Sequence, residues 1–177
     1  PVEGNLFPVP RPMWPNKVKE IRQFDEIIIG DFRLLQGGDD PIWKECEKSL
    51  ANASKTIGLV QVYVYNLNAD MQVHESVRQY IDGDTIHMLV YGEEVQADDV
   101  IILDEAVFER KQKYIPNIHS QHVQVVVRDT ITELTEQHIT TLFNQEPVWM
   151  PENNEIRKQL EGSKHLIAKQ NWVNESE

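Results

Sequence analysis

The loop from residue 33 to residue 40, RLLQGGDD, holds the densest set of chemically useful residues in this sequence. Gly37 and Gly38 let the backbone approach a ligand closely, and a helix that starts after Asp40 would offer free N–H groups to an anion. Arg33 can pair with a phosphate or carboxylate, or neutralise a neighbouring aspartate. The glycines are equally compatible with a plain turn. The loop matches neither GxGxxG nor a P-loop, so it gives no support to those nucleotide sites.

Four acidic residues, Asp98, Asp99, Asp104 and Glu105, flank the apolar run at 100–103. Carboxylates beside a strand end suit a magnesium ion, or the aspartate pocket of a receiver domain. A solvated strand start followed by a helix cap explains the same residues more simply, because Asp104 can cap a helix that begins at the next residues. We favour that second interpretation.

Cysteine and histidine give little support to a metal or nucleophile site. The single cysteine, Cys46, excludes an internal disulfide and a cysteine-based zinc site, and two glutamates flank it, so we expect it to pack inside the protein. Among six histidines there is no HExxH motif, and the closest pair, His119 and His122, makes a weak metal candidate. His87 lies within a predicted strand and is the histidine that we expect to be most buried.

The elements that must position these residues alternate between short apolar runs and amphipathic stretches. Strands are predicted at residues 26–32, 56–65, 85–90, 100–103, 122–127 and 148–150. Helices are predicted from residue 41, over 73–82, over 106–115, after residue 130 and over 153–160. One direct step from strand to strand is expected around 92–99. This order predicts an α/β fold, a Rossmann-like three-layer sandwich with a mostly parallel sheet and helices on both faces.

Local signals place the helix starts and the buried helix faces. Asp40 can cap the first helix, with Pro41 in its first turn, and Thr130 with Glu133 has the spacing of a capping box. Gly83 supplies a stop after the second helix. The first helix should bury Ile42, Cys46 and Leu50, and the helix after Thr130 should present Ile131, Leu134, Leu142 and Phe143.

Composition limits the class of protein. A chain of 177 residues with 40% hydrophobic and 26% charged residues is typical of one soluble globular domain. The net charge of -12, without an evident Lys/Arg cluster, argues against nucleic acid as a partner. No stretch is long enough to span a membrane and no signal peptide is evident, so a cytoplasmic location is expected.

The chain divides into three parts by composition. Residues 1–23 are proline-rich and are interpreted as a linker, 24–174 as the Rossmann-like domain, and 175–177 as a truncated continuation. Because the chain begins at proline and stops just after a hydrophobic pair, we interpret it as a segment of a longer protein.

Ligands of open α/β sheets bind beyond the carboxyl ends of the strands. The residues predicted to follow those ends are rich in carboxylates and tyrosines, which suit hydrogen bonds to sugar hydroxyls and stacking on a sugar ring. They are Asp31, Arg33, Tyr63, Tyr65, Asn66, Tyr91 to Glu94, Asp104, Glu105, Arg128 and Asp129.

Several stretches carry a family resemblance. FDEIIIGDFRLLQGG at 24–38 and TIGLVQVYVY at 56–65 resemble the opening strand, glycine loop and second strand of the N-terminal domain of certain bacterial glycosyltransferases. The run from 74 to 128, with VYGE, VIILDEAVFE and VQVVVR, is similar to the continuation of that domain. PVWMP and NWVN near the end resemble the section that leads out of it.

The resemblance implies half of a GT-B architecture, in which this half receives the acceptor and a second Rossmann-like half holds the nucleotide-sugar donor. It implies a role in the assembly of a cell-wall polymer, a teichoic acid or a capsular polysaccharide. Catalysis would take place between the halves, so this domain would not complete it alone. No cofactor or metal is expected here. The donor-binding acidic motif expected of the second half is absent, which fits a fragment.

The expected partners are a sugar or wall-polymer acceptor and the adjacent domains of the parent chain. Peripheral association of the parent protein with the inner face of the membrane is a further hypothesis. No general base is assigned. The acceptor-binding candidates are Arg33, Gly37, Gly38, Tyr65, Tyr91 and Glu93.

Two other functions stay open. The domain could be a structural or interaction module within a larger wall-polymer synthase, which the lack of a paired acid and base favours. A receiver-like signalling domain is suggested by Asp98, Asp99 and Asp104, but an aspartate-to-lysine arrangement around a fifth strand is not evident.

Overall fold

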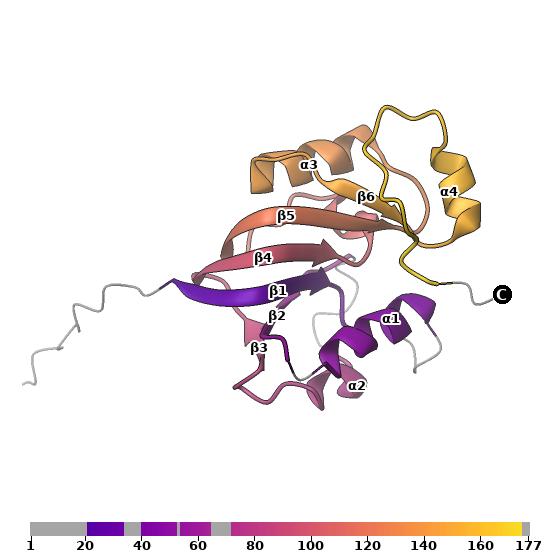
Figure 1. Ribbon diagram of the computed structural model, residues 1–177. Helices are drawn as coiled ribbons and strands as arrows, with labels where there is room; N and C mark the ends of the chain where they lie inside the picture. The colour runs from indigo at the N-terminus through magenta and orange to yellow at the C-terminus, as the bar shows by residue number, and fades with distance from the viewer. Residues whose placement is uncertain (1–20, 34–39, 53, 65–71, 175–177) are drawn as a thin grey trace, which may run out of the picture.

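The computed structural model describes residues 21–33, 40–52, 54–64 and 72–174. These residues form one six-stranded sheet in which every pair of neighbouring strands is parallel. Helices lie on both faces of the sheet (Figure 1), so the fold is a Rossmann-like three-layer α/β sandwich, as the sequence predicts. Within the described residues, no helix has the length and apolar character needed to cross a membrane.

The strands are β1 (Arg22–Gly30), β2 (Ile57–Gln61), β3 (Ile86–Leu89), β4 (Glu94–Ile102), β5 (Asn117–Val127) and β6 (Val148–Pro151). The helices are α1 (Pro41–Leu50), α2 (Glu75–Arg78), α3 (Glu133–Phe143) and α4 (Asn154–Leu160), with a 3₁₀ turn η1 (Glu105–Phe108) after β4. Each predicted strand overlaps an observed one.

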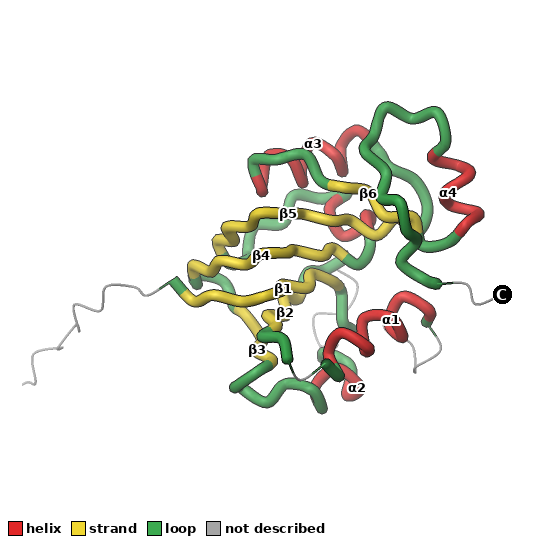
Figure 2. Tube along the Cα trace, viewed as in Figure 1, coloured by secondary structure: helices red, strands yellow, loops and turns green. Residues whose placement is uncertain are grey.

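The strand order is β3-β2-β1-β4-β5-β6, with β1 inside the sheet between β2 and β4. The chain builds outward from β1 to β3, then crosses back and builds outward on the other side (Figure 2). The three consecutive isoleucines Ile27, Ile28 and Ile29 are fully buried, because a central parallel strand is covered on both faces. The direction in which successive strands are added to the sheet reverses between β1 and β4, which is called here the reversal of strand order.

Two hydrophobic cores hold the layers together. On one face, Ile28 packs with Trp43 and Cys46 of α1. On the other face, Ile29 packs with residues that include Phe108 of η1 and Ile139 of α3. The crossovers thus divide between the faces, with α1 and α2 on one and η1, α3 and α4 on the other.

The first helix is confirmed in detail. Asp40 caps α1, since its Oδ1 accepts a hydrogen bond of 3.0 Å from the backbone N–H of Ile42. Ile42, Cys46 and Leu50 are buried on one face, as their spacing predicts.

Two predicted helices are much shorter than expected. The helix expected over 106–115 is only η1, which Asp104 caps and which ends at Phe108, with the Glu105 side chain buried. The helix expected over 73–82 is only α2. It ends at Arg78 with Gln79 as its C-cap, so Gly83 is not its stop. Asp82 accepts hydrogen bonds from three following backbone N–H groups, and these, with the positive φ of 72° at Gly83, turn the chain toward β3.

Three boundaries also differ. β4 begins at Glu94, so most of the step expected at 92–99 is a strand whose side chains alternate between exposed and buried. The cap of α3 is Thr132 and not Thr130. Phe143 is buried as predicted, and Thr135 and Ile139 are buried with it on the i, i+4 face of α3. Leu134 and Leu142, which were also expected to face the core, are exposed.

Candidate functional site

The strands all point one way, so the residues that follow their carboxyl ends share one edge of the sheet, called here the carboxyl edge. Its charged and polar members come from five strands and from the start of α1. They are Asp31, Arg33, Asp40, Gln61, Tyr63, Asp104, Glu105, Arg128 and Glu152.

Asp31 and Arg33 form a buried, two-point ion pair after β1. Arg33 Nε donates to Asp31 Oδ1 and Arg33 Nη2 to Asp31 Oδ2, each at 2.8 Å. Both side chains are less than 5% exposed. The guanidinium also lies over the ring of Tyr63, 4.5 Å from its centre. The interpretation of Arg33 as the partner of a neighbouring aspartate is therefore confirmed.

Further donors hold the same carboxylate. Gln61 Nε2 donates to Asp31 at 2.7 Å, and the backbone N–H of Val64 donates at 3.1 Å. Burial pushes the pKa of Asp31 upward, but the hydrogen bonds from Arg33, Val64 and Gln61 outweigh it and lower the pKa below its ordinary value. Asp31 thus joins the ends of β1 and β2 as a charged carboxylate.

Glu105 plays a similar role between β4 and β5. Its two carboxylate oxygens accept hydrogen bonds from the backbone N–H groups of Arg128, Asp129 and Thr130, at 2.8, 2.8 and 3.1 Å. Burial raises the pKa of Glu105 to about 7, with the nearby Asp104 adding to the rise and the amide donors opposing it. A glutamate with such a pKa can exchange a proton near neutral pH, but its oxygens face the backbone.

Arg128 connects the carboxyl edge to α1. Its guanidinium contacts Asp40 through two atoms at 3.2 Å and Glu152 at 3.6 Å. Burial raises the pKa of Glu152, and the positive charge of Arg128 offsets part of this rise. The segment after α4 also contacts α1, since Trp172 Nε1 donates a hydrogen bond of 3.2 Å to the carbonyl oxygen of Ile42.

The structure does not bring the predicted acceptor residues together. Arg33 lies at the carboxyl edge, whereas Tyr91 and Glu93 lie in the short connection before β4, where Glu93 pairs with Arg22 at 3.4 Å. Arg22 starts β1, a nine-residue strand of about 25 Å. The ring of Tyr91 packs edge-on against Tyr114, and both are exposed. Gly37, Gly38 and Tyr65 lie outside the described residues.

The predicted acidic set is also divided. Asp98 and Asp99 lie within β4, and Asp99 pairs with His122 at 3.3 Å, while Asp104 caps η1 as expected. His119 pairs with Glu94 at 3.0 Å. No group of three or more His, Cys, Asp or Glu side chains within the described ranges could hold a metal ion. The receiver-like arrangement therefore lacks a cluster of carboxylates.

The remaining titratable candidates are structural. Cys46 is buried, and burial raises the pKa of its thiol, which keeps it in the unreactive form. His87 is half-buried in β3, with Nε2 at 2.6 Å from the carbonyl oxygen of Asp84.

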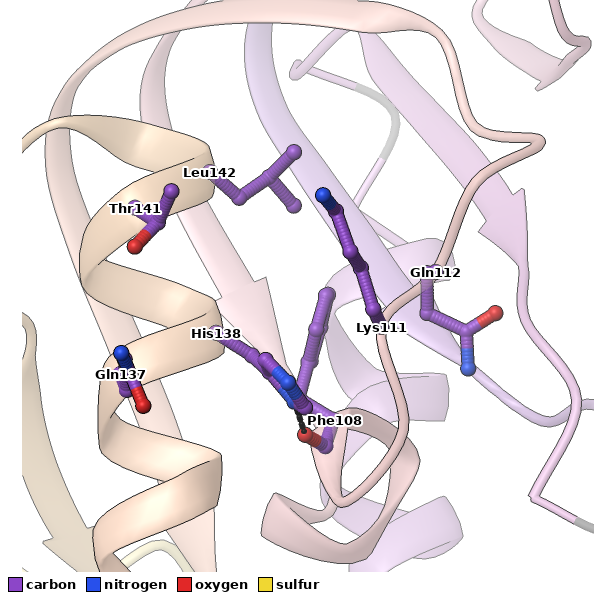
Figure 3. Close-up of a pocket in the computed structure, with 7 residues that line it drawn as sticks. All are labelled: Phe108, Lys111, Gln112, Gln137, His138, Thr141 and Leu142. Carbon is purple, nitrogen blue, oxygen red and sulfur yellow. Dashed lines mark hydrogen bonds between the residues drawn. The ribbon is translucent and has the colours of Figure 1, made fainter.

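A hollow that the sequence reasoning missed lies between α3 and the segment after η1. It has a volume of about 460 Å³, and its lining includes Phe108, Lys111, His138 and Leu142 (Figure 3). The two walls are some thirty residues apart in the chain, so no local motif marks the site. The one available signal is the run ERKQK at 109–113, three cations in a chain of net charge -12.

Comparison with protein-family models, with curated proteins and with solved structures gave no match to this chain.

Proposed function

We propose that this chain is the acceptor-side half of a GT-B type glycosyltransferase that acts in the assembly of a cell-wall polymer, a teichoic acid or a capsular polysaccharide. A partner domain would hold the nucleotide-sugar donor, and this half would present the acceptor to it. The proposal rests on the sequence resemblance together with one observation, the all-parallel Rossmann-like sheet whose strand order reverses between β1 and β4.

The reversal supports the carboxyl edge as the acceptor-binding edge. Where neighbouring strands send their crossovers to opposite faces, a crevice opens beyond the carboxyl ends, and ligands of open α/β sheets bind there. Tyr63 lies at this edge and is about half exposed, with Arg33 on its ring. An exposed tyrosine ring next to fixed polar groups suits a sugar, which offers both C–H faces and hydroxyl groups.

A second candidate function has its own support. The carboxylates of Asp31 and Glu105 are buried and are held by internal hydrogen bonds, so neither is placed as an open catalytic base. A Rossmann-like module that only positions neighbouring domains would have such an edge. The two functions differ in whether the edge binds a glycan.

A binding experiment on the 177-residue chain separates them. Amide signals of the labelled protein are followed by NMR during titration with wall-polymer fragments, nucleotide sugars and free nucleotides. We expect a glycan or polymer fragment to bind, nucleotides not to bind, and the shifted signals to cluster around Tyr63.

Two tyrosine variants locate the binding edge. Tyr63→Ala should weaken glycan binding at least tenfold. Tyr91 is a more exposed tyrosine near the opposite edge, and Tyr91→Ala should leave glycan binding unchanged. Loss of binding in Tyr91→Ala alone would overturn the carboxyl edge as the acceptor site. No binding of any glycan would overturn the transferase proposal in favour of the module.

A further inference from the structure

The hollow beside α3 has the size and walls of a small-molecule site. Its volume of about 460 Å³ falls within the range of about 300–1,000 Å³ usual for ligand pockets. A second hollow of about 220 Å³ adjoins it, sharing Gln112 and Leu142, and continues toward the start of β5. Phe108 and Leu142 give the larger hollow, called here the α3 pocket, an apolar surface (Figure 3).

Lys111 is the cation in the lining of the α3 pocket. It belongs to a run of three cations, Arg110, Lys111 and Lys113, in which Glu109 is the single acid, and Lys113 lines the second hollow. None of these cations takes part in an ion pair between described side chains. Figure 3 shows Lys111 reaching from its loop toward Leu142 of α3. An ammonium group in this position can receive an anion.

Hydrogen bonds to the backbone fix two polar side chains of the lining. His138 Nδ1 lies 2.7 Å from the carbonyl oxygen of Phe108. Because a carbonyl oxygen only accepts, Nδ1 carries the proton and Nε2 is the acceptor of the neutral ring. Gln112 Nε2 donates to the carbonyl oxygens of Val107 at 2.7 Å and Tyr63 at 3.3 Å, which orients its amide. These side chains are ordered before any ligand binds.

The helix adds further hydrogen-bonding groups. Gln137 and Thr141 are one turn apart on α3 and both line the α3 pocket. The lining thus combines the exposed aliphatic surface of Leu142 with two amides, a hydroxyl, an imidazole and a lysine. Amides and hydroxyls bind the hydroxyl groups of a ligand, and the apolar surfaces cover its C–H face.

We propose that the α3 pocket binds an anionic sugar, a monosaccharide that carries a phosphate or a carboxylate. Lys111 pairs with the anionic group, while the amides and the Thr141 hydroxyl bind the sugar hydroxyls. The sugar ring packs against Leu142, the exposed apolar side chain of the lining. The α3 pocket borders the carboxyl edge, since Gln112 also bonds the backbone of Tyr63, but it shares no lining residue with that edge. The inference does not depend on the function proposed above.

Calorimetric titration of the 177-residue chain tests the site with four probes. They are glucose 6-phosphate, glucuronate, glucose and inorganic phosphate. We expect one of the two anionic sugars to bind at least tenfold more tightly than glucose and than inorganic phosphate. Amide signals at 108–113 and 137–142 should shift in the NMR spectrum of the same mixture.

Matched lysine variants link binding to the α3 pocket. Lys111→Gln should weaken binding of the anionic sugar at least tenfold, whereas Lys158→Gln, an exposed lysine on α4, should bind like the wild type. Both changes are at the surface, so both variants should keep the wild-type melting temperature. Thr141→Val should lower the affinity for the anionic sugar but leave the affinity for inorganic phosphate unchanged.

Three results would overturn the inference. They are failure of both anionic sugars to bind, unchanged affinity in Lys111→Gln, and equal affinity for inorganic phosphate and the sugar phosphate. Binding of a polymer fragment at Tyr63 in the same preparation would leave the transferase proposal intact in each case, so the two proposals fail separately.

Discussion

The carboxyl edge and the α3 pocket place charged groups in opposite circumstances. At the carboxyl edge, Asp31 meets an arginine, a glutamine and a backbone amide, and Glu105 meets three backbone amides. At the α3 pocket, Lys111 lies next to open space and enters no ion pair with a described side chain. Removing one partner of a buried, paired charge destabilises a fold strongly, while charge beside a pocket is available to a ligand.

The contrast predicts that substitutions at the two regions separate stability from binding. Changes at Asp31 and Glu105 should alter the free energy of unfolding, and changes at Lys111 should alter affinity. The predictions below run from the largest expected effect to the smallest.

The largest effect is expected from Asp31→Ala. This change removes the carboxylate that accepts hydrogen bonds from the Arg33 guanidinium, from Gln61 and from the backbone N–H of Val64. It should lower the free energy of unfolding by about 3–5 kcal/mol. Urea denaturation measures it. Lys48→Ala removes an exposed ion pair on α1 and should cost at most about 0.5 kcal/mol. Equal losses in the two variants would contradict a stabilising role for the buried pair.

Glu105 should make stability depend on pH. Its pKa is about 7 in the folded protein and near 4.5 when unfolded, so the folded state binds the proton more tightly between these values. The resulting stabilisation is present in full below pH 4.5 and is lost as the pH rises through 7, up to about 3 kcal/mol in all.

Urea denaturation from pH 5 to pH 8 checks this dependence against Glu105→Gln. Glutamine does not ionise, so the fall in stability with rising pH should be smaller in the variant by the contribution of Glu105. The variant should also be less stable throughout, because its amide NH₂ faces backbone N–H donors. Parallel pH profiles for the two proteins would show that Glu105 keeps its ordinary pKa.

The smallest effect is expected at the end of α3, which forms one wall of the α3 pocket. Asn144 has the left-handed φ of 52°, which asparagine and glycine tolerate better than alanine. Asn144→Ala should lower the free energy of unfolding by about 1 kcal/mol, and Asn144→Gly should not. Thermal melts measure both. Affinity for the anionic sugar should stay unchanged in Asn144→Ala, whereas Lys111→Gln should lower affinity and keep the melting temperature. A loss of affinity in Asn144→Ala would contradict the separation of stability from binding.

The sequence predicts the layers of this fold better than its connections. The run Ile27 to Ile29 marks the central strand because burial on both faces leaves no polar position, and Asp40 with Pro41 marks α1 through local capping chemistry. The sequence predicts a connection where the first half of β4 lies. One side of that half faces solvent, so its side chains there are polar and the apolar run typical of a buried strand is missing.

The candidate site was less predictable. Glu105 looked like a member of an acidic cluster, yet its partners are backbone amides more than twenty residues away. Tyr91 and Glu93 follow a strand, as expected, but the same four-residue connection delivers them to the start of β4. The walls of the α3 pocket meet only through tertiary packing. For Glu105 and for the α3 pocket the deciding contact is distant in sequence, which composition and spacing do not encode.

The Trp172 contact with α1 has a consequence for how the chain is made. It joins residues 130 positions apart, so the first turn of α1 gains this partner only after nearly the whole domain has been synthesised. In the same way, the central strand β1 can pair with β4, its neighbour on one side, only after the residues of β4 have been synthesised. Contacts of such long range slow folding. During synthesis, the early part of the domain therefore emerges from the ribosome with its main strand open on one side.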